Sequence, residues 1–99
     1  MYQLTSKQRA YLSSLANSEK AIIQIGRDGV TPEVTDAVSE ALRARELVKV
    51  NVQKNCPYDV KETAQMCAER TRSAVVQTIG RKFVLFKENL ELPNGIDLP

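Results

Sequence analysis

The 99-residue sequence predicts a single α/β domain in which helices cover a small, four-stranded mixed sheet. Apolar runs of strand length alternate with segments of helical periodicity, in the order helix, strand, helix, strand, helix, strand, strand. The length suits one modest core and is too short for two. A hydrophobic content of 42% and a charged content of 26% are ordinary for a folded globular chain and argue against disorder.

Each predicted helix begins after a side chain that can accept a hydrogen bond from the first helical turn. These caps are Thr5, Thr31 and Asp59. Pro32 follows Thr31 at the first helical position, where a missing N–H group does no harm. On the third helix, Cys67 lies on the apolar stripe, so we expect its thiol to be buried.

Four apolar or alternating segments predict the strands, at 21–25, 47–52, 74–79 and 83–86. Nearly every residue of the first segment is apolar, as in a strand that is covered on both faces. Strands that alternate with helices are expected to be parallel neighbours. The short connection before the last strand predicts a hairpin, which makes that strand antiparallel. Residues 92–99 contain two prolines and a glycine and are expected to form a loose tail.

A glycine-bounded loop, Gly26-Arg27-Asp28-Gly29, joins the first predicted strand to the second helix. Backbone that a ligand can approach, next to the free N–H groups of a helix start, suits a phosphate chain. The pattern is common by itself, and the glycines could instead supply only the dihedral angles of a turn. Asp28 counts against phosphate binding because it places negative charge at the proposed site.

Topology predicts that further cations lie near this loop. If the first three strands run in the same direction, their carboxyl ends share one edge, where open sheets commonly bind ligands. Lys54 follows the second strand, and a hairpin with two cations follows the third. The candidate phosphate-binding residues are Gly26, Arg27, Asp28, Gly29, Thr31, Lys54, Gly80, Arg81 and Lys82.

The charge distribution favours a nucleic-acid backbone as the ligand of this edge. Residues 1–87 carry 14 cations and nine anions, a net charge of +5, because the other three acidic residues lie in 88–99. The aromatic residues are Tyr2, Tyr11, Tyr58, Phe83 and Phe86, and they do not alternate with cations as in sheet-surface RNA readers. We therefore expect recognition of backbone and shape rather than base stacking. A solvated surface of mixed charge is the plain alternative.

Other classes of function are disfavoured. The chain has no histidine, no nucleophile elbow and no Walker loop, so we do not expect an enzyme. Cys56 and Cys67 lack metal-binding spacing, and we expect neither a metal nor a cofactor. No apolar run approaches the roughly 20 residues of a membrane helix, and the N-terminus does not resemble a secretory signal. A cytoplasmic monomer that does not contact membranes is expected.

Three ordered segments resemble the CRM domain family, named for chloroplast RNA splicing and ribosome maturation, and most closely its stand-alone bacterial members of the YhbY type. The segments are IGRDGVTPEV at 25–34, ALRARELVKV at 41–50 and VVQTIGRKFVLF at 75–86, and the opening LTSKQR at 4–9 is also similar. The match divides the chain into a CRM-like RNA-binding domain at 1–87 and a C-terminal tail at 88–99.

The resemblance implies a fold like that of the C-terminal domain of translation initiation factor 3, with a loop similar to the GxxG loop of KH domains. Gly26 to Gly29 match that loop, and Gly80 and Arg81 match the family's later Ile-Gly-Arg/Lys motif. The implied function is binding of structured ribosomal RNA during assembly of the large ribosomal subunit. The alternative is a protein-interaction module that docks on a ribosomal protein or assembly factor through the surface of the first helix.

Overall fold

Three helices and four strands make up the computed structural model, which describes residues 3–99. In chain order they are α1 (Ser6–Ala16), β1 (Ala21–Ile25), α2 (Pro32–Arg45), β2 (Leu47–Val52), α3 (Val60–Thr71), β3 (Ala74–Ile79) and β4 (Lys82–Phe86). This order confirms the predicted α/β class. The first two residues of the predicted domain at 1–87, Met1 and Tyr2, lie outside the described residues.

The helices begin at the predicted caps. The Thr5 hydroxyl accepts a hydrogen bond from the Gln8 backbone N–H at 3.1 Å, and the Gln8 side chain accepts one from the Thr5 backbone N–H, which completes a capping box. The side chains of Thr31 and Asp59 each accept from the backbone N–H three residues later, at 3.1 and 2.8 Å. These local contacts define where α1, α2 and α3 start.

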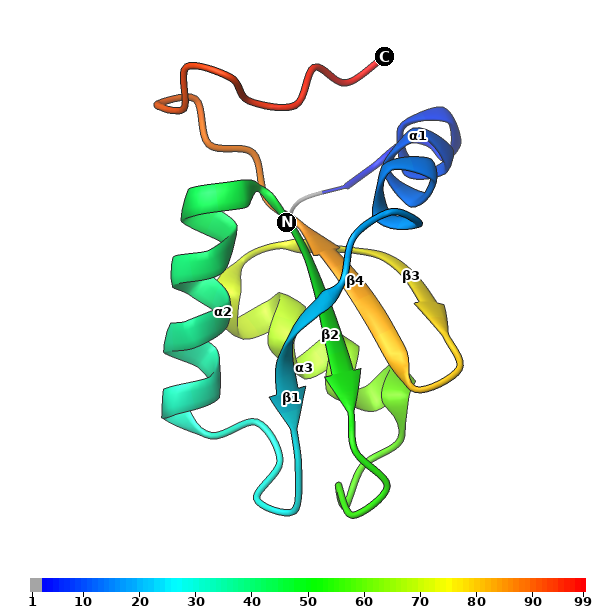
Figure 1. Cartoon of the computed structure of the whole chain (residues 1–99), viewed down its shortest axis with the longest axis vertical. Helices are drawn as coiled ribbons and strands as arrows, with labels where there is room; N and C mark the ends of the chain where they lie inside the picture. The colour runs from blue at the N-terminus through cyan, green and yellow to red at the C-terminus, as the bar shows by residue number, and fades with distance from the viewer. Residues whose placement is uncertain (1–2) are drawn as a thin grey trace.

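The four strands form one mixed sheet in the spatial order β1-β2-β4-β3. Strands β1 and β2 are parallel, and β4 is antiparallel to both of its neighbours, as the hairpin predicted. The expectation that β3 is a parallel neighbour of β2 is wrong, because β4 lies between them. Since β4 runs against both, β1, β2 and β3 still point in the same direction (Figure 1).

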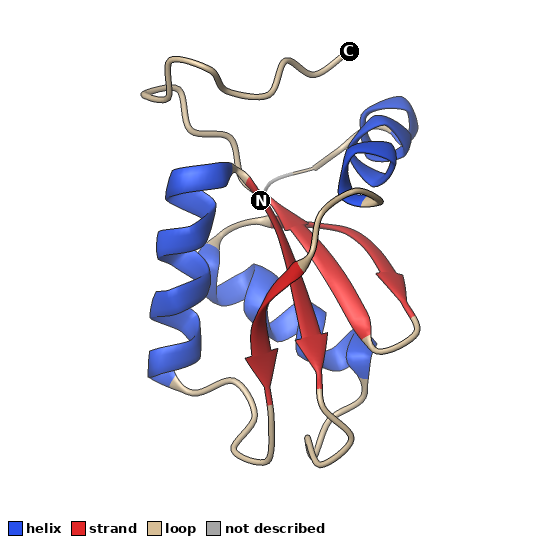
Figure 2. Cartoon of the chain, viewed as in Figure 1, coloured by secondary structure: helices blue, strands red, loops and turns tan. Residues whose placement is uncertain are grey.

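The two faces of the sheet are covered by different elements (Figure 2). Helices α2 and α3 cover one face, and the larger core between them and the sheet includes Leu42, Cys67 and Phe83. Helix α1 covers part of the other face, where Leu12 packs with Phe86 in a smaller core. Phe83 and Phe86 are both fully buried, because Phe83 packs in the larger core on one face and Phe86 in the smaller core on the other.

Strand β1 differs from its prediction, because it is covered on one face only. Ile25 is fully buried and Ile23 packs against the larger core, whereas Ile22 is 44% exposed and Gln24 is exposed. The apolar sequence suggested burial on both sides. Helix α1, however, buries sheet residues of β2, β3 and β4 and none of β1 in its core. One end of that sheet face is therefore open.

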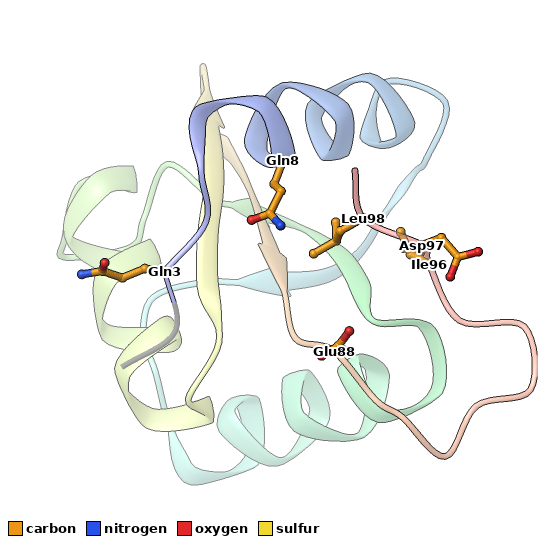
Figure 3. A pocket seen from close by; sticks show the side chains of 6 residues that line it. All are labelled: Gln3, Gln8, Glu88, Ile96, Asp97 and Leu98. Carbon is orange, nitrogen blue, oxygen red and sulfur yellow. The ribbon is translucent and has the colours of Figure 1, made fainter.

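The segment after β4 is not the loose tail that its composition suggested. The Glu46 side chain is only 2% exposed, and its carboxylate accepts backbone N–H groups of Asn89 at 2.7 Å and Ile96 at 2.6 Å. Ile96 and Leu98 pack against the smaller core, and a pocket of about 470 Å³ is lined by this part of the tail and by Gln8 of α1 (Figure 3). A buried carboxylate needs donors, and the tail supplies them.

The described chain measures 37 × 25 × 24 Å. The loops that follow β1 and β2 lie at one end of its long axis, and the C-terminal tail lies at the other (Figure 1). Among residues 3–99, no helix combines the length and apolarity that crossing a membrane requires.

Candidate nucleic-acid interface

Backbone hydrogen bonds join three loops side by side at the carboxyl ends of β1, β2 and β3. The Gln53 N–H donates to the Ile25 carbonyl at 2.8 Å, which links the loop after β2 to the glycine loop. The Val52 N–H donates to the Arg81 carbonyl at 2.7 Å, which links β2 to the β3–β4 hairpin. The edge predicted from topology is thus a continuous row of three connected loops.

Four cations lie along this row, and we name Arg27, Lys54, Arg81 and Lys82 the cationic rim. All four side chains are exposed, and none forms an ion pair or side-chain hydrogen bond with another residue of the range 3–99. Elsewhere the Lys49, Arg70 and Lys87 side chains bind backbone carbonyls. The rim cations therefore keep their full hydrogen-bonding capacity for a ligand.

Gly29 is required by the fold itself. Its N–H donates to the Gly26 carbonyl at 3.0 Å, which closes the turn. Gly29 has a φ of 68°, and a Cβ atom added there would lie 3.4 Å from the ring of Tyr58. Gly29 is buried, and the expected approach of a ligand to its backbone stays a prediction.

Gly26 is less constrained, and the middle of the loop faces solvent. Gly26 is half-buried, and an added Cβ would lie 2.6 Å from Oε1 of Gln53, the far end of an exposed side chain. Arg27 and Asp28 are both exposed. Asp28 makes no ion pair or side-chain hydrogen bond within residues 3–99, so its negative charge stands beside the rim without a structural role.

The start of α2 presents fewer free donors than expected. The Thr31 N–H donates to the Gly29 carbonyl at 3.1 Å, and the Val34 N–H donates to the Thr31 hydroxyl. Pro32 has no N–H group. Thr31 nevertheless keeps its hydroxyl proton, which can donate to a phosphate oxygen.

The β3–β4 hairpin holds the last three predicted residues. Ile79 pairs with Lys82, so Gly80 and Arg81 alone form the loop and Lys82 is the first residue of β4. Gly80 has a φ of 57° and open space around it, as a glycine-first, two-residue hairpin requires. The exposed Arg81 therefore lies in the turn at the edge of the sheet.

Three residues that shape the glycine loop were missed from sequence. The Arg70 guanidinium, on α3, donates to the Val30 carbonyl at 2.6 Å, just beyond the loop. The rings of Tyr58 and Pro57 pack against Gly29. A lone helix-surface arginine has no sequence pattern that marks such a contact, and Tyr58 is brought to Gly29 only by the pairing of β1 with β2.

The Cys67 thiol does not add reactive chemistry to this edge. Burial raises the pKa of the Cys67 thiol to about 11. The charge of nearby Arg70 acts to lower this pKa, and Cys56 acts to raise it. Cys67 is buried as predicted and stays protonated at neutral pH. In the part of the chain that the structure describes, no three His, Cys, Asp or Glu side chains come together as metal ligands would.

Comparison with known proteins identifies the family. The model of the CRS1 / YhbY (CRM) domain matches residues 4–87. A Bacillus subtilis protein named Probable RNA-binding protein YqeI is 43% identical over 96 residues, covering 97% of this chain and 99% of the relative. A Haemophilus influenzae protein named RNA-binding protein is 33% identical and covers 92% of each chain.

A solved structure agrees with these relatives. The solution structure of a hypothetical Staphylococcus aureus protein, described as a candidate RNA binder, superposes with a TM-score of 0.83 at 40% identity. The match covers 98% of this chain and 100% of that one. The names of these relatives describe RNA-binding proteins and not enzymes. From the matched domain and the near full-length relatives, we conclude that the chain belongs to the CRS1/YhbY (CRM) domain family.

Proposed function

We propose that this protein binds structured ribosomal RNA, mainly through the phosphate backbone, and acts in assembly of the large ribosomal subunit. The observation that carries the proposal is the cationic rim, whose four exposed cations lie on three connected loops and at the start of β4 and form no ion pair within residues 3–99. The names of the relatives support RNA as the ligand. The ribosomal target and the cytoplasmic location rest on the resemblance to YhbY-like proteins.

The rim suits a folded RNA because its loops are already ordered. Two backbone hydrogen bonds at the strand ends, from Gln53 to Ile25 and from Val52 to Arg81, hold the spacing of the loops before any ligand arrives. Preorganised loops avoid the entropy of ordering on binding. Arg27 and Arg81 can donate two hydrogen bonds each to a phosphate, whereas Lys54 and Lys82 act as point charges.

We also propose that two parts of the chain have different roles. Residues 1–87 carry the RNA-binding domain, and residues 88–99 stabilise the opposite end of the sheet. The tail holds three of the 12 acidic residues and no cation, so it is a poor surface for phosphate. We expect the domain to act as a monomer, without catalysis, metal or cofactor.

Crosslinking in cells followed by sequencing of the bound RNA tests the proposal. We expect the crosslinked reads to be enriched in precursors of the large-subunit ribosomal RNA. A variant with glutamine at the four positions of the cationic rim serves as the matched control and should lose that enrichment. Reads spread over unrelated transcripts, or an undiminished signal from the control variant, would overturn the ribosomal assignment.

A second candidate function is docking of a ribosomal protein or assembly factor. A groove of about 700 Å³ lies between α1 and α3, beside the edge strand β3, and its lining includes Arg9, Gln65 and Arg72. Edge strands flanked by grooves accept extended segments of other proteins. If docking is the main function, Arg9→Glu with Arg72→Glu should release the protein from precursor particles, while the rim variant should stay bound.

A further inference from the structure

The part of the sheet that lies next to the cationic rim spans all four strands and is open on one face. One cross-strand row contains Gln24 on β1, Asn51 on β2, Lys82 on β4 and Ile79 on β3, each paired with the next. The row lies on the face opposite α2 and α3, because Asn51 alternates with the buried residues Val50 and Val52 of the larger core.

Helix α1 leaves this row uncovered. The sheet residues in its core, such as Phe86 and Val84, lie nearer the other end of the strands. Ile79 is 55% exposed, and Gln24 and Lys82 are exposed as well. A half-open antiparallel face normally carries polar residues, and this one mixes amides, a cation and an exposed isoleucine.

Two amide side chains in the row hold each other in place. The Asn51 Nδ2 atom donates to the Gln24 Oε1 atom at 2.7 Å. This bond leaves the Gln24 amide group with two N–H donors and the Asn51 carbonyl oxygen as an acceptor, and neither is bonded to another residue between 3 and 99. A fixed donor beside a fixed acceptor is the pattern that reads the edge of an unpaired base.

The surface is continuous with the cationic rim. Ile79 and Lys82 flank the hairpin residues Gly80 and Arg81, and Lys82 belongs to both the row and the rim. The four members of the row include a cation and no carboxylate. A strand of RNA whose phosphates lie on the rim can therefore place a base on this row without meeting a carboxylate of the row itself.

We propose that the open sheet face binds an unpaired RNA base, with Gln24 and Asn51 recognising its edge and Ile79 packing against its ring. This inference rests on the proposed RNA-binding function and deepens it, since it adds base contacts to a site predicted from backbone contacts alone. The expected ligand is thus an RNA with a loop, bulge or end beside a paired segment.

Fluorescence anisotropy with two labelled strands separates base contacts from backbone contacts. One probe is a 12-nucleotide unpaired RNA containing A, C and U, and the other is the same ribose-phosphate chain without bases. We expect the full-length protein to bind the strand with bases about tenfold more tightly, as one or two added hydrogen bonds and a packed base provide.

The double variant Gln24→Ala with Asn51→Ala should abolish this preference while leaving affinity for the abasic strand unchanged. Gln24→Ala alone changes an exposed side chain. It replaces the double variant in this test if the double variant unfolds at a lower temperature than the unchanged protein. Gln65→Ala, an exposed glutamine on α3, is the matched control and should keep the preference. Substitution of the rim cations by glutamine should weaken the binding of both strands to the same extent.

The outcomes distinguish the two proposals. Tight binding of both strands with equal affinity, or a preference that survives the double variant, would overturn base recognition at the sheet and leave backbone binding at the rim intact. Failure of the protein to bind either strand or any structured RNA would overturn the proposed function together with this inference. Loss of preference in the double variant alone supports the open sheet face as a base-binding surface.

Discussion

The two ends of the sheet use their polar side chains in different ways. At the end that holds the loops after β1 and β2, the four cations of the rim make no ion pair or side-chain hydrogen bond within residues 3–99. At the other end, the Glu46 carboxylate binds two backbone N–H groups, and the Lys87 ammonium binds the Thr71 carbonyl at 3.0 Å. The Asn89 side chain donates to the Arg43 carbonyl at 2.7 Å.

This difference separates structural polar groups from available ones. A polar side chain that already satisfies the backbone contributes to folding, and its removal leaves a buried group without a partner. A charged side chain that faces only water contributes little to stability and is free to bind a ligand. We therefore expect substitutions at the tail end to change stability and substitutions at the rim to change binding.

The largest effect on stability is expected from Glu46→Ala. The substitution removes both acceptors of the Asn89 and Ile96 backbone N–H groups, and we expect it to lower the free energy of unfolding by about 3 kcal/mol. Glu46→Gln keeps one carbonyl acceptor and should lose roughly half as much. Urea denaturation of both variants measures this, with the exposed Glu40→Ala as control.

A loss below about 1 kcal/mol in Glu46→Ala would show that the tail does not stabilise the domain through this carboxylate. The contrast between the two ends also predicts that the variant binds RNA as the unchanged protein does. Reduced RNA affinity in a folded Glu46→Ala protein would break that separation.

An intermediate effect is expected within the glycine loop. Gly29→Ala places a side chain at a φ of 68° and against Tyr58, and should lower the free energy of unfolding by about 1–2 kcal/mol. Gly26→Ala clashes with the end of the Gln53 side chain, which can move, and makes an ordinary contact with Asn55, so its cost should be about 0.5 kcal/mol or less.

Thermal denaturation of the two alanine variants checks this order, and the reverse order would contradict our account of the loop. The pair also sharpens the comparison of the two ends, because Gly26→Ala tests binding in a stable protein. If RNA contacts the loop at Gly26, that variant binds more weakly although it melts normally.

The smallest effect should be a gain in stability from Arg72→Gly. Arg72 ends α3 in the left-handed region, with φ 58° and ψ 43°, where glycine is not strained. We expect a gain of about 0.5–1 kcal/mol, measured by urea denaturation. Arg72→Ala removes the same side chain without relieving the backbone and is the control. Equal stability of the two variants would show that the dihedral angles at this position cost little.

The parts of the fold that depend on local sequence were predictable. Thr5, Thr31 and Asp59 cap the three helices because a cap and the turn it binds are adjacent in sequence. The strands followed from apolar runs in the same way. The position of β4 between β2 and β3 was not predictable from these patterns, since strand order depends on packing between distant segments.

Long-range contacts account for the rest of the differences. In the sequence, Glu46 resembles an ordinary surface residue at a helix end. Only the folded chain shows that the backbone N–H groups of residues 89 and 96 donate to its carboxylate. The exposure of Ile22 could not be seen from an apolar strand sequence, because it depends on how far α1 reaches. The rim was predictable because strand direction alone brings its loops to one edge.

The comparison of the two ends is tested most directly by paired removal of charge. Arg81→Gln with Lys82→Gln removes two exposed cations at the rim, and Arg43→Gln with Arg45→Gln removes two exposed cations at the far end of α2. Binding of large-subunit ribosomal RNA is measured by filter binding over a range of salt concentrations.

We predict that the rim pair weakens binding at least tenfold and reduces the slope of log K against log salt by about 1.5, the value for two lost phosphate contacts. The pair on α2 should leave affinity and slope nearly unchanged. Equal losses from both pairs, or a slope that the rim pair does not alter, would contradict the assignment of RNA binding to this edge.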